Sequence, residues 1–326
     1  MRYRRFVVVG ASGFVGRYIV KHLAAEGALI AAVSRRASAA GFLRTMGDVG
    51  QIALIDAGIT DRDRIAPLLD GAAAVINAAG ILYERGTQRF EALHETGPAR
   101  LATLAAAAGV PRFVHISAIG ADPASPAHYG RSKAVGEAAV RAAMPQATII
   151  RPSLIFGPED SFFNRFAAIA RISPVLPLIG GGGTRFAPVF VGDVAAAVAA
   201  TLERDDAPGR VYELGGPQIE TLRSLFGLIL RETGRRCLLL PVPFGLASVP
   251  AALLEIAAQA LHAVGFTAPP LLTRDQVRML RRDAAPAPGM PGLTVLGIEP
   301  TALDLILPTY LDRFRRRGRA AGAHAV

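Results

Sequence analysis

The sequence has almost none of the cysteine that forms disulfides and cysteine zinc sites. Its 326 residues include one cysteine, Cys237, and no tryptophan. A single cysteine cannot form an internal disulfide and excludes a zinc site made of cysteines, which fits a reducing compartment. The six histidines have no metal-ligand spacing, so we expect no metal site. No signal or transit segment is evident at the start, because a strand pattern begins within five residues of Met1. We therefore expect a chain that is not secreted.

Charge is also scarce, and it is unevenly placed. Charged residues make up 19% of the chain and hydrophobic residues 51%, which excludes a disordered protein. The formal net charge is +10, but three arginines lie in residues 2–5 and five in residues 313–319. Without these eight, 28 basic residues face 26 acidic ones. Basic ends suit an anionic partner or a lipid surface, and they argue against a nucleic-acid groove.

One long run without charge, residues 237–254, needs a separate explanation. It contains Pro241, Pro243 and Pro250, which would leave backbone groups unpaired in hydrocarbon. We therefore reject a membrane-spanning helix there. A buried element and a membrane-surface element both remain open for this run.

The first half of the chain alternates short apolar runs with longer helical stretches, which is typical of successive βαβ units. Strands are predicted at residues 6–9, 29–33, 51–55, 74–77, 112–117 and 148–151, with helices between them at 15–26 and 98–108. A helix at 191–202 and a strand at 211–214 would return the chain to the sheet. This pattern predicts an α/β fold with a doubly wound parallel Rossmann sheet and a smaller interleaved C-terminal lobe. The expected boundaries are 1–156 and 187–216 for the Rossmann domain, 157–186 and 217–314 for the lobe, and 315–326 for a basic flexible tail.

A glycine motif marks a dinucleotide site. Gly10, Gly13 and Gly16 follow the first predicted strand and open the first helix. They would provide a tight turn, close approach of a pyrophosphate, and close packing of helix on strand. The second strand ends in Ser34, Arg35 and Arg36 where an NAD site would have a carboxylate. Guanidinium groups favour a 2′-phosphate, so we expect NADPH rather than NADH, unless these arginines are ordinary solvated charges.

A tyrosine and a lysine are spaced for one face of a helix. Tyr129 and Lys133 are four residues apart, and Lys133 is one of only two lysines beside 34 arginines. The ammonium would lower the pKa of the tyrosine and hold ribose hydroxyls. With Ser117 polarising a substrate oxygen, Tyr129 could exchange a proton during hydride transfer. Alternatively, Ala118, the neighbour of Ser117, occupies the position where an active enzyme would have its hydroxyl. The same groups could equally hold a cofactor without turnover.

These motifs resemble the extended short-chain dehydrogenase/reductase superfamily: the glycines, Asn77-Ala-Ala-Gly80, Tyr129-x-x-x-Lys133 and the run Arg151-Pro-Ser-Leu-Ile-Phe-Gly-Pro158. Further segments, at residues 129–137, 156–166, 238–244, 272–279 and 291–298, make almost the whole chain similar to the alpha-subcomplex subunit nine family of respiratory complex I. Members of that family are accessory subunits that hold NADPH tightly beside the junction of the peripheral and membrane arms.

The resemblance implies a set of cofactor-binding residues: Gly10, Ser12, Gly13, Phe14, Val15, Gly16, Ser34, Arg35, Arg36, Gly58, Ile59, Ala78, Ala79, Gly80, Ser117, Tyr129, Lys133, Pro152 and Leu154. Gly58 departs from the aspartate that many superfamily members place near the adenine. The implied partners are complex I subunits and a phospholipid surface, the latter met by residues 238–264 and 313–319. The implied location is peripheral, on the cytoplasmic face of a bacterial inner membrane or on the matrix side in a mitochondrion. The alternative is a free-standing oxidoreductase, epimerase or dehydratase that uses Tyr129 and Lys133.

Overall fold

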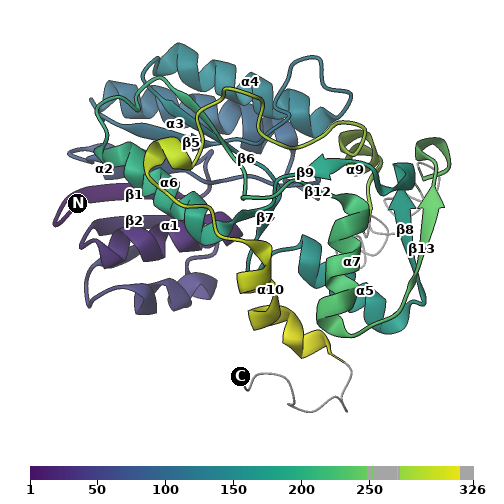
Figure 1. Ribbon diagram of the computed structural model, residues 1–326. Coiled ribbons are helices and arrows are strands. Elements are labelled where there is room, and N and C mark those ends of the chain that lie inside the picture. Colours follow the sequence, from purple (N-terminus) through teal and green to yellow (C-terminus); the bar gives the residue numbers. More distant parts are fainter. Residues whose placement is uncertain (248–251, 253–269, 271, 316–326) are drawn as a thin grey trace.

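A seven-stranded parallel sheet forms the centre of the protein in the computed structural model, which describes residues 1–247, 252, 270 and 272–315 (Figure 1). The strand order is β11-β6-β5-β4-β1-β2-β3. The strands are β1 (Arg5–Val9), β2 (Leu29–Ser34), β3 (Ile52–Asp56), β4 (Ala74–Asn77), β5 (Phe113–Ile116), β6 (Thr148–Pro152) and β11 (Val211–Leu214). The chain winds outward in both directions from β1. This reversal marks a switch point between the carboxyl ends of β1 and β4, and it is at such a crevice that open α/β sheets bind ligands.

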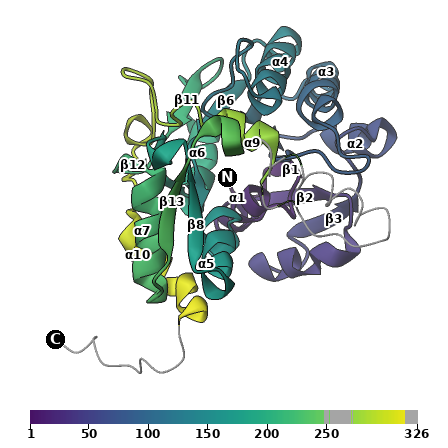
Figure 2. The same ribbon diagram turned by 90° about the vertical axis from the view of Figure 1, so that its right-hand side faces the viewer.

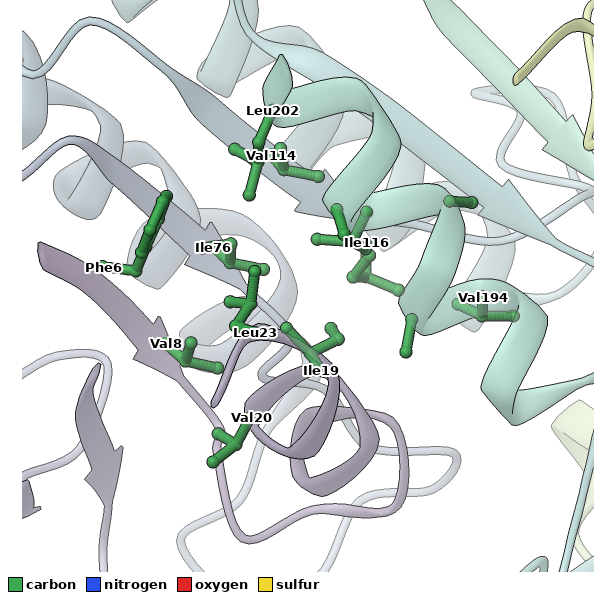
Figure 3. Packing of buried hydrophobic residues seen from close by; sticks show 14 of the residues in the cluster. Phe6, Val8, Ile19, Val20, Leu23, Ile76, Val114, Ile116, Val194 and Leu202 are labelled. Carbon is green, nitrogen blue, oxygen red and sulfur yellow. The ribbon is translucent and has the colours of Figure 1, made fainter. Parts of the chain in front are cut away.

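Helices cover both faces of the sheet because each strand is apolar on both sides. On one face lie α1 (Phe14–Ala25) and α6 (Val191–Glu203), packed on side chains such as Val8 and Ile76 (Figure 3). On the other face lie α2 (Arg62–Leu69), α3 (Gly97–Ala107) and α4 (His128–Ala143). A 3-10 helix, η1 (Ser38–Met46), precedes β3, and a π-helix, η2 (Glu91–Thr96), leads into α3. The predicted doubly wound α/β fold is confirmed.

A second cluster of buried side chains lies to one side of the sheet, away from β2 and β3 (Figure 2). It is formed by α5 (Phe162–Ile172), α7 (Leu222–Thr233) and α10 (Leu303–Leu311), with the parallel pair β8 (Val175–Ile179) and β13 (Leu238–Val242). The smaller elements are β7 (Ile155–Phe156) with β10 (Val189–Phe190), β9 (Arg185–Phe186) with β12 (Glu220–Thr221), α9 (Arg274–Met279), η3 (Gly180–Gly182), η4 (Thr294–Leu296) and η5 (Asp312–Phe314). The exact division of the chain into domain and lobe stays a prediction.

The run without charge begins as a strand. Residues 238–242 pair with β8, and the exposed side chains Leu238 and Leu240 alternate with the partly buried Leu239. Most of residues 248–264, and the tail from residue 316 onward, lie outside the described residues. Within the described part of the chain, no helix combines the length and apolar character needed to span a bilayer.

Candidate functional site

The glycine turn between β1 and α1 has no room for a side chain at Gly10 or Gly16. Gly10 has a φ of +84°, and a Cβ added there would lie 2.7 Å from the backbone nitrogen of Ala79. A Cβ on Gly16 would lie 2.2 Å from the carbonyl oxygen of Gly10. The turn therefore requires glycine at both positions, one for its left-handed backbone and one for the contact between helix and turn.

The first turn of α1 is open to an anion. Gly13 is its N-cap residue, no side chain in the described part of the chain caps the helix, and no acidic residue lies in the first turn. The leading amides of a helix have no partner within it and carry the positive end of the helix dipole. Ala78, Ala79 and Gly80 follow β4 directly opposite Gly10. The residues present thus fit a pyrophosphate at the crevice.

The end of β2 brings several predicted residues together. The hydroxyl oxygens of Ser12 and Ser34 lie 2.6 Å apart. The stem of Arg35 covers Gly58, since a Cβ on that glycine would lie 3.6 Å from the arginine Cγ, and its guanidinium donates to Gln88 Oε1 at 3.3 Å. Arg36 is exposed. Neither arginine pairs with a carboxylate of the described residues, so both charges are available to an anionic ligand.

Tyr129 and Lys133 lie in the first two turns of α4, and both are buried. The Lys133 ammonium donates to the carbonyl oxygen of Ile116 at 3.1 Å, and burial lowers its pKa to about 8. Burial raises the pKa of Tyr129 to about 12. We expected Lys133 to lower the pKa of Tyr129, and that expectation is wrong. The phenol is packed against the rings of Phe90 and His94, and the loss of solvent determines the direction.

Ser117 follows β5 at the same edge of the sheet. Its backbone amide donates to Ile150, but its hydroxyl is buried without a hydrogen-bond partner among the described residues. Buried polar groups are normally paired, so this hydroxyl suits a ligand atom. The ammonium of Lys133 has three N–H groups, of which the Ile116 carbonyl takes one. Both groups can therefore bind ribose or carbonyl oxygens.

The other predicted residues line the edges of this region. Phe14 and Val15 begin α1, and Pro152 ends β6. Ile59 packs against the start of α3, where a Cβ on Gly97 would lie 2.9 Å from it. Leu154 packs with the second buried cluster and is less closely tied to the crevice.

Asp275, which the sequence did not single out, anchors the helix that carries Tyr129. Its carboxylate accepts hydrogen bonds from the backbone amides of His128 at 2.7 Å and Tyr129 at 2.8 Å. It thereby caps α4, whose own N-cap residue, Ala127, makes no side-chain capping hydrogen bond. The cap comes from a residue 146 positions away from Tyr129, so no local sequence signal reveals it.

Arg151 also holds α4 in place through an ion pair with Glu137. Its guanidinium binds both oxygens of Glu137 on α4, at 2.9 and 2.6 Å, and contacts Glu213 on β11 at 3.4 Å. Glu137 and Glu213 are buried, so each carboxylate depends on the arginine for its charge compensation. Among the described residues, no cluster of histidine, cysteine or acidic side chains could hold a metal ion.

Comparison with known proteins identifies the family. The model of the "NAD dependent epimerase/dehydratase family" matches residues 6–215. An Arabidopsis thaliana protein, "NADH dehydrogenase [ubiquinone] 1 alpha subcomplex subunit 9, mitochondrial", is 34% identical over 97% of this chain and 79% of its own length. The chain belongs to this epimerase/dehydratase family and to the alpha subcomplex subunit 9 group.

Some other proteins similar to this chain carry the names of enzymes. A "Ceramide reductase" from Caulobacter vibrioides is 34% identical over 59% of this chain and 59% of its own length. A solved structure of an epimerase from Methanothermobacter thermautotrophicus superposes with a TM-score of 0.73 over 96% of this chain and 92% of the other, at 16% identity. At that identity the structural likeness concerns the fold alone.

Proposed function

We propose that this chain is an accessory subunit of respiratory complex I that holds NADP(H) as a structural ligand without turnover. The likeness to an alpha subcomplex subunit 9 protein over 97% of the chain carries this proposal. We place the subunit at the junction of the peripheral and membrane arms, on the cytoplasmic face of a bacterial inner membrane or the matrix side in a mitochondrion.

The residues of the crevice have separate tasks in this proposal. The turn from Gly10 to Gly16 and the amides of Phe14 and Val15 bind the pyrophosphate. Lys133 and Tyr129 hold the nicotinamide ribose, and Ser117 donates to or accepts from an atom near the nicotinamide. A bound nicotinamide supplies hydride-transfer chemistry. The raised pKa of Tyr129 keeps its phenol protonated at neutral pH, so in the folded chain it is a hydrogen-bond donor rather than a base.

The alternative is a free-standing oxidoreductase or epimerase. The positions of Lys133 and Ser117 at the carboxyl end of β5, with Tyr129 one turn before Lys133 on α4, favour it. The likeness to a ceramide reductase favours it as well. Tyr129→Phe separates the two functions. If the chain is an enzyme, the variant should lose turnover of a carbonyl or sugar-nucleotide substrate while it still binds nucleotide. If the chain is an accessory subunit, the variant should leave the activity of the complex unchanged.

The main experiment is to release and identify the nucleotide. We expect the purified protein, when denatured, to release NADP(H) at close to one per chain, and to co-purify with complex I after extraction in mild detergent. A preparation that is folded but takes up neither pyridine nucleotide would contradict the cofactor assignment. A protein never found with the complex would contradict the assignment as a subunit.

The preference for NADP(H) rests on Ser34, Arg35 and Arg36 beside Ser12. We expect Arg35→Asp combined with Arg36→Ala to weaken NADPH binding far more than NADH binding, because a carboxylate repels a 2′-phosphate. Isothermal titration with both nucleotides measures the change. Equal loss for the two nucleotides would mean that the phosphate is bound elsewhere.

A lipid surface is the second proposed partner. Leu238, Leu240 and Leu246 expose 64%, 49% and 67% of their surface, and Ile172 exposes 87%. The sequence also carries five arginines in residues 313–319. Arginine near an anionic leaflet contributes about 1 kcal/mol of binding free energy. Replacing Arg316, Arg317 and Arg319 with glutamine should therefore reduce sedimentation with phosphatidylglycerol vesicles and leave binding to phosphatidylcholine vesicles unchanged.

A further inference from the structure

A π-helix shapes the backbone beside the crevice. Residues 91–96 of η2 pack so closely on neighbouring backbone that two glycines are required. A Cβ on Gly136 of α4 would lie 1.8 Å from the carbonyl oxygen of His94, and one on Gly97 would lie 2.5 Å from that of Ala92. Single π-turns are rare and occur often at functional sites. Here the turn fixes the position of one side chain, that of His94.

The hydrogen bonds of His94 define a single tautomer. Its Nε2 accepts from the backbone amide of Ile81 at 3.1 Å, so this nitrogen carries a lone pair. Its Nδ1 therefore carries the hydrogen and donates to the hydroxyl of Ser132 at 2.9 Å. That hydroxyl in turn donates to the carbonyl oxygen of Tyr129 at 2.9 Å. One imidazole thus connects the loop after β4 to the first turn of α4.

The surroundings of His94 keep the ring neutral and in place. The imidazole stacks on Phe90, with ring centroids 5.0 Å apart, and meets the ring of Tyr129 edge-on at 5.4 Å. Burial and the nearby charge of Lys133 lower its pKa to about 2. His115 and His128 are the other titratable groups whose charge acts on it, and both act in the same direction.

We propose that His94 is a positioning residue of the nucleotide site. Its lone pair holds the Gly80–Ile81 backbone beside Lys133, and its N–H holds α4 in the position that presents Tyr129 and Lys133 to the ribose. Gly80 lies between the two groups, since a Cβ there would be 3.4 Å from Lys133 Nζ and 3.6 Å from His94 Nε2. The inference rests on the proposed function, because it assigns His94 to the same nucleotide site.

Three substitutions separate the two hydrogen bonds. His94→Gln can offer an amide oxygen near the position of Nε2, His94→Asn can offer a donor near that of Nδ1, and His94→Leu offers neither. We expect the affinity for NADPH to fall about tenfold in His94→Leu, equivalent to about 1.4 kcal/mol. His94→Gln should stay within about threefold of the wild type, because the bond to Ile81 is the one beside Lys133, whereas His94→Asn should fall nearly as far as His94→Leu. His22→Leu, at a partly exposed position on α1, is the matched control. Unchanged affinity in His94→Leu, or a glutamine variant no better than leucine, would overturn the proposal.

A second measurement needs no nucleotide. In protein labelled with ¹⁵N-histidine, NMR should show one imidazole with its hydrogen on Nδ1 and no titration between pH 5 and pH 8, and His94→Gln should remove that signal. If the imidazole signal that His94→Gln removes shows an Nε2–H tautomer or a normal titration, the proposed arrangement of His94 is overturned. If the wild type binds no nucleotide, the proposed function fails, and this spectrum still tests the position of His94. Binding in the wild type that His94→Leu does not weaken overturns only the role of His94.

Discussion

Lys133 should make the folded protein less stable than a neutral side chain would. Its pKa is about 8 in the folded chain, against the ordinary value of 10.5, and the cause is burial. Each pKa unit corresponds to about 1.4 kcal/mol, so burying the charged form costs about 3 kcal/mol below pH 8. Lys133→Met removes this cost and loses the hydrogen bond to the Ile116 carbonyl, which contributes about 1 kcal/mol. We expect the nucleotide-free variant to be more stable than the wild type by about 2 kcal/mol at pH 7.

The difference in stability between the wild type and Lys133→Met should change with pH in a direction that follows from the lowered pKa. Between pH 8 and 10.5 the unfolded chain binds the lysine proton and the folded chain does not, so the stability of the wild type rises with pH in this window. Lys133→Met has no titrating group at this position. Its excess stability over the wild type should therefore shrink above pH 8 and be largely gone by pH 10. Urea unfolding at several pH values measures the difference. Lys21→Met replaces the only other lysine, which is exposed on α1, and should show no such dependence.

The same variant should bind nucleotide poorly, because its side chain cannot hold ribose hydroxyls. Stability and binding would then change in opposite directions, as expected of a residue kept for a ligand. A Lys133→Met protein less stable than the wild type at pH 7, or a difference that does not vary between pH 7 and pH 10, would refute the reasoning about burial.

Three other substitutions test the scaffold around the site. Gly16→Ala should abolish nucleotide binding in a titration and cost about 1–3 kcal/mol in urea unfolding, because its Cβ would meet the Gly10 carbonyl; full binding would contradict the tight turn. Arg151→Met should cost about 3 kcal/mol, since Glu137 would be left buried and unpaired, and a neutral result in thermal unfolding would contradict this. Asp275→Ala should cost about 1 kcal/mol and raise hydrogen exchange at the start of α4, whereas unchanged exchange would mean that the cap contributes nothing.

The central sheet could be predicted because its signals are local. A parallel strand buried on both faces is a continuous apolar run, so β4 and β11 were predicted with the bounds they have. The pairs β7–β10 and β9–β12 are two residues long and have no sequence pattern. The strand β13 was taken as part of an apolar stretch, because three successive leucines hide the alternation that its pairing with β8 creates.

In the candidate site, the sequence indicated which groups were present but not how they are solvated or linked. The glycine turn is specified by residues next to one another, and its geometry agrees with its spacing. His94 and Asp275 were missed, since their partners Ser132 and Tyr129 are 38 and 146 residues away. The predicted direction of the Tyr129 pKa shift is wrong because it, too, depends on residues that are distant in the sequence. Nearness to Lys133 can be inferred from helical spacing, whereas burial depends on Phe90 and the π-helix.

These features together indicate why a ligand would matter to a subunit of the proposed kind, which would hold it without turnover. Among the described residues, the Ser117 hydroxyl has no hydrogen-bond partner, no side chain caps the start of α1, and the Lys133 ammonium has one acceptor. Each of these groups is a hydrogen-bond donor or a cation that suits an oxygen-rich anion. A dinucleotide would therefore supply hydrogen-bond acceptors for all of them, and it would do so only in the folded state. Binding of that kind adds about 4 kcal/mol of stability when the ligand is a thousandfold above its dissociation constant. The ligand would thereby tie the loop after β4, the glycine turn and α4 into one rigid surface for docking.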